Sequence, residues 1–206
     1  MDLSNGYLTN LLTYIQPDIT PVEVVCMYGY RGTMAFMHRD NSCVFEDFNR
    51  TMEEYSNGFG PVPRNRWVGL VTMFHIMKQP TKHWTIIFRS KRANFFKTYY
   101  YNVTCQDATL GYELNFATSG HGGGGCGSCM QELRGNRFST FDQDNTGANN
   151  CVRRFGGGWW FDNDTDCTVS FLTGPMDGPD ENNHLIDAPP SSEPFMYLQI
   201  QLQRYL

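Results

Sequence analysis

The sequence predicts an α+β domain organised around an antiparallel sheet, and three observations lead to this fold class. Short runs rich in β-branched and aromatic residues recur along the chain and are typical of strands. Only two short segments have helical features, and they do not alternate with the strands as in a parallel βαβ arrangement. The chain has 206 residues, 40% of them hydrophobic and 15% aromatic, which is enough to bury one sizeable core.

The predicted strands share side chains that suit a half-buried, pleated surface. Their ranges are 22–28, 33–38, 84–88, 98–104, 112–116 and 195–202. The last strand follows an irregular segment, 175–194, that holds five of the ten prolines. A strand that returns after such a segment indicates that the long loops are held within the domain.

Two short helices are expected between the strands. Thr51 and Glu54 have the spacing of a capping box, which predicts a helix through residue 55 that stops near Gly58. A second helix is predicted over 70–78 and ends before the following proline.

The charge pattern argues against nucleic acid as a partner, because the net charge is −5. Residues 64–97 carry eight basic side chains and no acid, whereas residues 155–203 carry eight acids and no lysine or arginine. One interpretation is a basic binding face, for example for sulfated glycan, opposite an acidic, cation-binding end. The other is that the two segments face each other or are simply solvated.

Neither a membrane span nor a secretory leader is expected. The longest near-apolar run, 67–77, is about half of the roughly 20 residues that a membrane helix needs. The first fifteen residues contain Asp2 and lack a basic start. The chain is therefore either intracellular or a piece of a longer secreted protein.

Cysteines and glycosylation sequons favour secretion. Asn49, Asn102 and Asn163 each begin an Asn-X-Thr triplet, the acceptor for N-linked glycans. Seven cysteines exceed ordinary cytosolic usage, and their odd number leaves one thiol without a partner inside the chain.

A CxxC pair, Cys126 and Cys129, lies in a glycine-rich segment beside His121. It could be a redox dithiol, half of a zinc site, or a surface loop with a disulfide. Six glycines within 120–127 oppose the helix that a redox motif needs, so the loop is favoured. The histidines show no paired spacing of a metal or catalytic site, and we expect no enzyme.

Residues 142–147 alternate oxygen-bearing side chains before a glycine. Asp142, Asp144 and Thr146 precede Gly147 in the manner of a loop that wraps calcium. Aspartate and asparagine are also common in turns for conformational reasons alone, and this alternative stays open. For the adjacent Trp159 and Trp160, a packing role is favoured over a ligand platform.

The surrounding block resembles the fibrinogen-related domain family. Its motifs are Phe138-Ser-Thr140, Asp142-x-Asp144-Asn145, Cys151, Gly156-x-Gly158-Trp159-Trp160, Cys167 and Leu172-Thr-Gly174. A second block matches in the correct order. Its motifs are Asp47-Phe48-Asn49-Arg50, Glu53-Glu54-Tyr55, Gly58-Phe59-Gly60 and Arg66-Trp67-Val68-Gly69-Leu70.

The resemblance implies a fibrinogen C-terminal-like globule with a central twisted antiparallel sheet, short helices and a loop-rich, ligand-facing subdomain. The whole chain, 1–206, would be one such domain. Its subdomains would be an N-terminal part to about residue 60, a central sheet from about 61–130 plus 195–206, and calcium- and ligand-binding loops over 131–194.

A calcium site is part of this implied structure. Asp144 matches the first of two aspartates that hold the ion in the family, and Thr146 replaces the second. Ala148 falls where a carbonyl ligand is expected, and Asp142 is close enough in sequence to substitute. Loss of one carboxylate weakens such a site.

The resemblance also pairs Cys151 with Cys167. In lectin-like members the ligand pocket lies beside this disulfide, and a cis peptide precedes the second cysteine. The matching positions here are Asp166, Cys167 and Thr168. The loop over 160–167 is about three residues longer than usual and more acidic, and the family's downstream aromatic residues have no match.

The implied function is a secreted, non-enzymatic recognition module that binds carbohydrate, in particular N-acetylated glycans, in innate recognition. The alternative is a protein-binding signalling or extracellular-matrix domain, as in angiopoietin-type proteins, without sugar binding. Oligomers would form through a region outside this chain.

Overall fold

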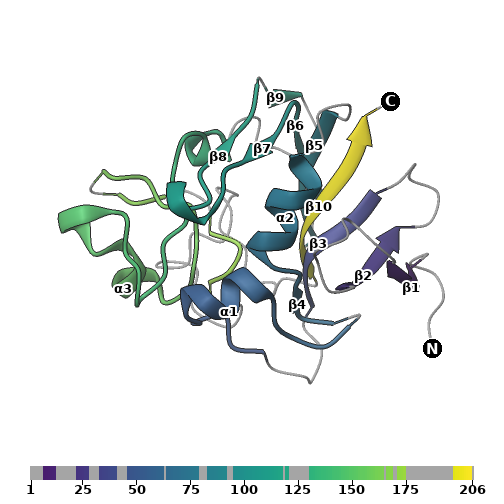
Figure 1. Ribbon diagram of the computed structural model, residues 1–206, viewed down its shortest axis with the longest axis horizontal. Coiled ribbons are helices and arrows are strands. Elements are labelled where there is room, and N and C mark those ends of the chain that lie inside the picture. Colours follow the sequence, from purple (N-terminus) through teal and green to yellow (C-terminus); the bar gives the residue numbers. More distant parts are fainter. Residues whose placement is uncertain are drawn as a thin grey trace.

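The architecture has a sheet at one end and a loop-rich region at the other, with two helices alongside the sheet (Figure 1). A computed structural model of the chain describes residues 7–12, 22–27, 33–40, 46–62, 64–78, 83–91, 95–117, 119–120, 130–164, 166–168, 171–174 and 197–205. The described residues between 130 and 174, with the short helix α3, form the left-hand end in Figure 1.

The main sheet is antiparallel, and its strands run in the spatial order β1, β2, β3, β10, β5, β6, β9. Their bounds are Tyr7–Leu12, Val22–Met27, Thr33–Asp40, Tyr197–Tyr205, His83–Lys91, Phe95–Tyr100 and Ser119–Gly120. A further strand, β4 (Arg66–Trp67), pairs with β3. The strands β7 (Thr104–Cys105) and β8 (Leu114–Asn115) form a separate two-stranded sheet. The predicted α+β class is confirmed.

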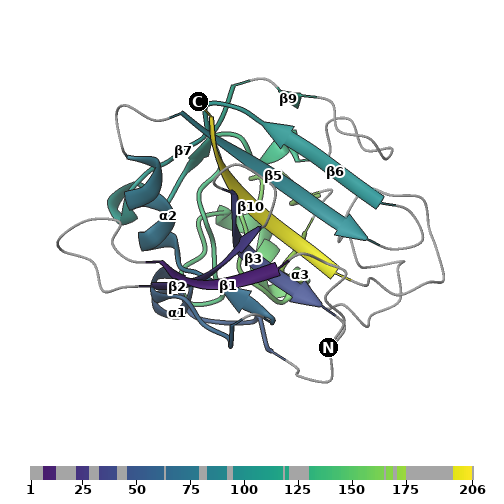
Figure 2. The ribbon, with the colours of Figure 1, turned by 90° about the vertical axis from the view of Figure 1, so that its right-hand side faces the viewer.

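The strand β10 lies in the middle of the sheet, between β3 and β5 (Figure 2). Tyr197 pairs with Asp40 on one side and with Lys91 on the other. The sheet also contains β1, β2 and β3, which come from the segment expected to form a separate N-terminal part. Hydrogen bonding across β3 therefore joins that segment to the central sheet.

Both predicted helices are present. The helix α1 (Met52–Asn57) begins at a complete capping box, in which Thr51 and Glu54 accept each other's backbone N–H groups. It ends at Gly58, whose φ of +93° disfavours other residues. The helix α2 (Leu70–Met77) ends at Lys78.

The helix α3 (Cys151–Phe155), which has five residues, is not predicted by the sequence pattern. Its flanking residues, Asn150 and Gly156, both have left-handed conformations. A helix this short has too few turns for a periodic apolar pattern, so the sequence carries no strong signal for it. Three 3₁₀ turns, η2 (Ala108–Leu110), η3 (Gln131–Leu133) and η4 (Gly147–Asn149), complete the described helical elements.

A cluster of buried aromatic rings joins the two motif blocks. The ring centroids of Tyr55 and Phe138 are 4.9 Å apart, and those of Trp67 and Trp160 are 6.2 Å apart. A Cβ atom on Gly158 would lie 2.5 Å from the Tyr55 ring, so only glycine fits there. Trp159 and Trp160 are fully buried, which confirms their packing role.

Candidate functional site

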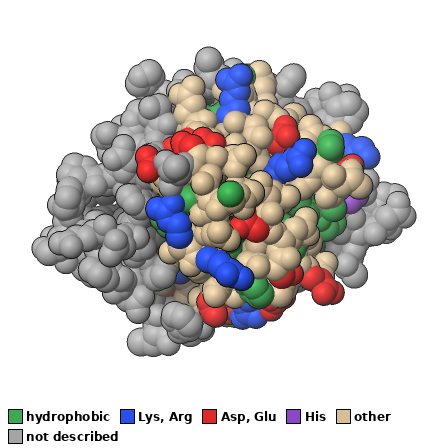
Figure 3. Space-filling view, turned by 90° about the vertical axis from the view of Figure 1, so that its left-hand side faces the viewer, with side chains coloured by type: hydrophobic (Ala, Val, Ile, Leu, Met, Phe, Trp, Pro, Cys, Tyr) green, Lys and Arg blue, Asp and Glu red, His purple; other side chains and the backbone are tan. Residues whose placement is uncertain are grey.

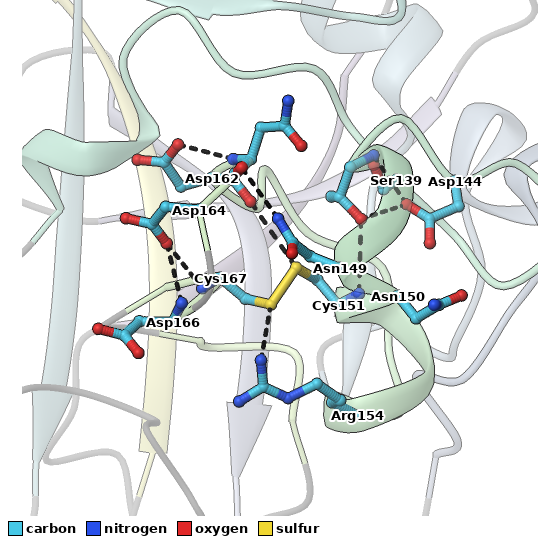
Figure 4. Close-up of a disulfide and its surroundings, with 12 residues drawn as sticks. Ser139, Asp144, Asn149, Asn150, Cys151, Arg154, Asp162, Asp164, Asp166 and Cys167 are labelled. Atoms are coloured by element: carbon cyan, nitrogen blue, oxygen red, sulfur yellow. Dashed lines mark hydrogen bonds between the residues drawn. A yellow bond between two sulfur atoms is a disulfide. The ribbon is translucent and has the colours of Figure 1, made fainter.

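The disulfide between Cys151 and Cys167 is formed and joins α3 to the acidic loop over 160–167 (Figure 4). Both cysteines are buried, and their Cα atoms are 5.5 Å apart. The pairing implied by the resemblance is therefore confirmed. The bond fixes the loop against α3 by restricting the unfolded chain, an effect of about 3 kcal/mol for a loop of this size.

The proposed calcium ligands begin with Asp144 and Thr146, which bind each other. The Oδ1 atom of Asp144 accepts hydrogen bonds from the backbone N–H and the hydroxyl of Thr146, at 2.8 and 2.5 Å. Thr146 is buried, and its hydroxyl oxygen accepts from the Cys151 backbone N–H at 3.4 Å. The Thr146 hydroxyl, which stands where the family has a second carboxylate, thus binds the carboxylate of Asp144.

The other two expected ligands are also hydrogen-bonded within the protein. Asp142 accepts from the backbone N–H of Met52 at 2.9 Å and from the Thr140 hydroxyl at 2.7 Å. The Ala148 carbonyl accepts from the Asn150 amide at 3.1 Å.

This donor set does not fit calcium well. Calcium takes six to eight oxygen ligands, usually with several carboxylates. Within the described part of the chain, no group of three or more His, Cys, Asp or Glu side chains is arranged to hold a metal ion.

Of the three residues expected to bind a ligand, Asp166 is exposed, whereas Cys167 and Thr168 are buried. The Thr168 hydroxyl donates to Glu132 Oε1 at 2.8 Å. Cys167 has a φ of +68°, a strained backbone conformation for a residue other than glycine or asparagine. Asp164 supports this turn, because its Oδ1 accepts from the backbone N–H groups of Asp166 and Cys167, both at 3.0 Å.

Charged groups of both signs surround the disulfide. Asp162, Asp164 and Asp166 lie on one side of it, and the Arg154 guanidinium approaches it from α3 (Figure 4). The Arg154 Nη1 donates to the Cys167 sulfur at 3.4 Å. Acidic and basic side chains are interspersed over this end of the molecule, and hydrophobic side chains show only in small areas (Figure 3).

Sequence reasoning missed Arg39, which anchors the loop beyond the tryptophan pair. Its buried guanidinium donates to the carbonyls of Leu172 and Gly174, at 2.9 and 2.5 Å. It also lies 4.2 Å from the centre of the Phe48 ring. The hydrophobic strand around it gave no signal that this arginine faces carbonyl oxygens.

The other residues that the sequence singled out are exposed, buried or outside the described part of the chain. Asn49, Asn102 and Asn163 are all exposed, as glycosylation requires. Cys105 is a buried free thiol, and burial raises its pKa to about 12. The CxxC pair, His121 and Cys43, together with the side chains of Cys26 and of much of the basic segment, lie outside the described residues.

Comparison with known proteins places this arrangement in a family. The family model of the C-terminal globular domain of fibrinogen beta and gamma chains matches residues 2–184. The chain belongs to this family. This fibrinogen-like domain is 31% identical to chicken (Gallus gallus) tenascin over 167 residues, which is 78% of the chain and 9% of tenascin. It is 29% identical to mouse (Mus musculus) angiopoietin-4 over 157 residues, which is 75% of the chain and 30% of that relative.

Solved structures agree on the fold. The fibrinogen-like globe domain of human ANGPTL2 superposes with a TM-score of 0.76 at 18% identity, covering 98% of this chain and 94% of that one. The fibrinogen-like domain is a non-enzymatic recognition module, and the related proteins are extracellular. The chain spans less than two fifths of the length of each curated relative named here. No described helix is long and apolar enough to cross a membrane.

Proposed function

We propose that this fibrinogen-like domain is an extracellular protein-recognition module whose contact surface is the disulfide face. We define the disulfide face by the exposed residues around the Cys151–Cys167 bond. They are Gly147, Ala148, Asn150, Arg153, Arg154, Asn163, Asp164 and Asp166.

The observation that carries this proposal is the orientation of the polar groups at the disulfide face. Thr168, at a position where the resemblance places a sugar-binding residue, is buried and donates its hydroxyl to Glu132. The exposed groups are instead charges of both signs, and their loop is held by the disulfide and by the backbone hydrogen bonds that Asp164 accepts. Fixed charges of mixed sign suit a protein surface of complementary charge, because groups that are already ordered lose little conformational entropy on binding.

A lectin-like function, the recognition of N-acetylated glycans in innate immunity, is the second candidate. The left-handed conformation of Cys167 favours it, because strained backbone is concentrated at ligand sites. In this candidate Asp166 and the Thr168 backbone would line the sugar site.

We further propose that the 142–148 loop keeps its shape without calcium. Each of the four expected ligands has a hydrogen-bond partner within the protein. Binding through the disulfide face would then persist in EDTA.

The test is binding of the multimerised domain to intact cells, to protease-treated cells and to glycosidase-treated cells. Protein recognition predicts that protease abolishes binding and glycosidase does not. Asp166→Lys and Arg153→Glu should each weaken binding, whereas Glu53→Lys, an exposed change on α1, should not. Loss of binding after glycosidase alone would favour the lectin. Absence of binding by a folded sample, or equal binding by all three variants, would overturn the disulfide face as the contact surface.

A further inference from the structure

The attachment position of one sequon lies in the middle of the disulfide face. We propose that Asn163 carries an N-linked glycan that shields this face and thereby controls access of partners to it. The partner-blocking role rests on the proposed function, whereas the modification and the shielding do not.

The backbone of Asn163 is fixed from both sides. Its N–H donates to Asp162 Oδ1 at 2.6 Å, and its carbonyl accepts from the Asn149 side-chain amide at 2.9 Å. Next to it, the Asp162 N–H donates to the Cys167 carbonyl at 2.6 Å and closes the acidic loop. The backbone at the position where a glycan would be attached is therefore fixed by hydrogen bonds.

The side chain of Asn163 lies between two parts of the disulfide face, the η4 turn and the exposed aspartates of the acidic loop. A Cβ atom on Gly147 would be 3.4 Å from the Asn163 Oδ1, so the end of the side chain lies beside the η4 turn. On the other side, Asp164 and Asp166 follow directly in the chain and are exposed. The Asn163 residue is itself exposed, and none of the described hydrogen bonds uses its Nδ2 atom, to which the sugar is attached.

A glycan at this position would cover what surrounds it. N-linked glycans are bulky and hydrated, so they exclude a second macromolecule from the surface beneath them. The acidic loop over 160–167 contains the whole Asn163 sequon. The Asn102 sequon, by contrast, lies between β6 and β7 and provides a matched control.

The experiment uses the full chain secreted from eukaryotic cells, with peptide mapping before and after enzymatic deglycosylation. We expect Asn163 to be occupied. Labelling of exposed carboxylates should then show loss of protection at Asp164 and Asp166 in Asn163→Gln and in Thr165→Ala. The second variant removes the acceptor triplet and keeps the asparagine. Asn102→Gln should leave this protection unchanged.

The labelling requires no binding partner, so it separates this inference from the proposed function. An unoccupied Asn163, or an occupied Asn163 with equal labelling of Asp164 and Asp166 in all variants, would overturn the inference. Where a cellular partner binds, both sequon variants should bind about tenfold more tightly than the glycosylated chain. Equal binding would overturn the blocking role.

Discussion

Asp142 accepts a hydrogen bond from the backbone N–H of Met52 at 2.9 Å, although 90 residues separate them in the chain. Met52 is the first residue of α1, where N–H groups have no partner within the helix. The aspartate that resembles a calcium ligand in sequence therefore caps a helix from a distant loop. It joins the two motif blocks at the protein surface.

Asp142→Ala should destabilise the domain by about 1 kcal/mol, the usual cost of losing a helix cap. Urea unfolding followed by far-UV circular dichroism measures this change. Gln143→Ala is the matched control, because Gln143 is exposed and its described bonds are made by the backbone. Equal stability of the two variants would contradict the capping role.

Tyr55 connects the same blocks inside the core. Its hydroxyl donates to the Phe48 carbonyl at 2.6 Å and accepts from the Gly158 N–H at 3.1 Å. Tyr55→Phe should cost about 1–3 kcal/mol, because it leaves buried backbone groups without partners. Tyr101→Phe, at an exposed tyrosine, should change the free energy of unfolding far less, and a comparable loss there would refute the argument.

Burial also raises the pKa of Tyr55 far above its ordinary value of 10. The folded state therefore favours the neutral phenol, and the unfolded state ionises first. The stabilisation is complete below pH 10 and decreases as the pH rises above it. Urea unfolding from pH 8 to 11 should show a decline that is smaller in Tyr55→Phe. Parallel pH profiles for the two proteins would contradict this linkage.

Cys105 should be unreactive in the native protein, because burial raises its pKa from 9 to about 12. Iodoacetamide at pH 8 should modify the Cys105 peptide only after denaturant is added, as read by mass spectrometry. Fast native labelling of that peptide would show that the thiol is accessible. The test distinguishes Cys105 from the other cysteines because each is mapped separately.

Thr146→Asp should create a calcium dependence that our proposal does not assign to the wild type. The added carboxylate next to Asp144 supplies the missing ligand charge, and its burial without metal is costly. Calcium at a hundredfold excess over its dissociation constant should stabilise the variant by about 2.7 kcal/mol. Thermal unfolding with calcium or EDTA measures this shift. Thr146→Ser, which keeps the hydroxyl, should not respond, and a calcium-dependent wild type would refute the proposal.

Local patterns predicted the elements that depend on local chemistry. The capping box of Thr51 and Glu54 placed α1 correctly, and the strong final strand placed β10. The strand β1 was missed because its mixed sequence, YLTNLL, alternates only weakly and acquires its state by pairing with β2. The helix α3 begins at a disulfide cysteine and is flanked by residues in left-handed conformations. Neither feature produces a periodic pattern in the sequence.

The candidate site was only partly predictable for a similar reason. Motif resemblance placed Cys151 beside Cys167, but the direction of each polar side chain depends on partners far away in sequence. Asp142 accepts a hydrogen bond from the Met52 N–H, and the Thr168 hydroxyl donates to Glu132. Nothing within the 138–174 block indicates either partner.

The central position of β10 has a consequence for biosynthesis. Residues 197–205 pair with both β3 and β5, so a ribosome must translate almost the entire domain before the middle of the sheet can form. Until then, β3 and β5 present unpaired edges, which are prone to aggregate. Nascent copies of this domain would therefore depend on chaperones until the last strand emerges, and frameshifts before residue 197 would remove the centre of the sheet.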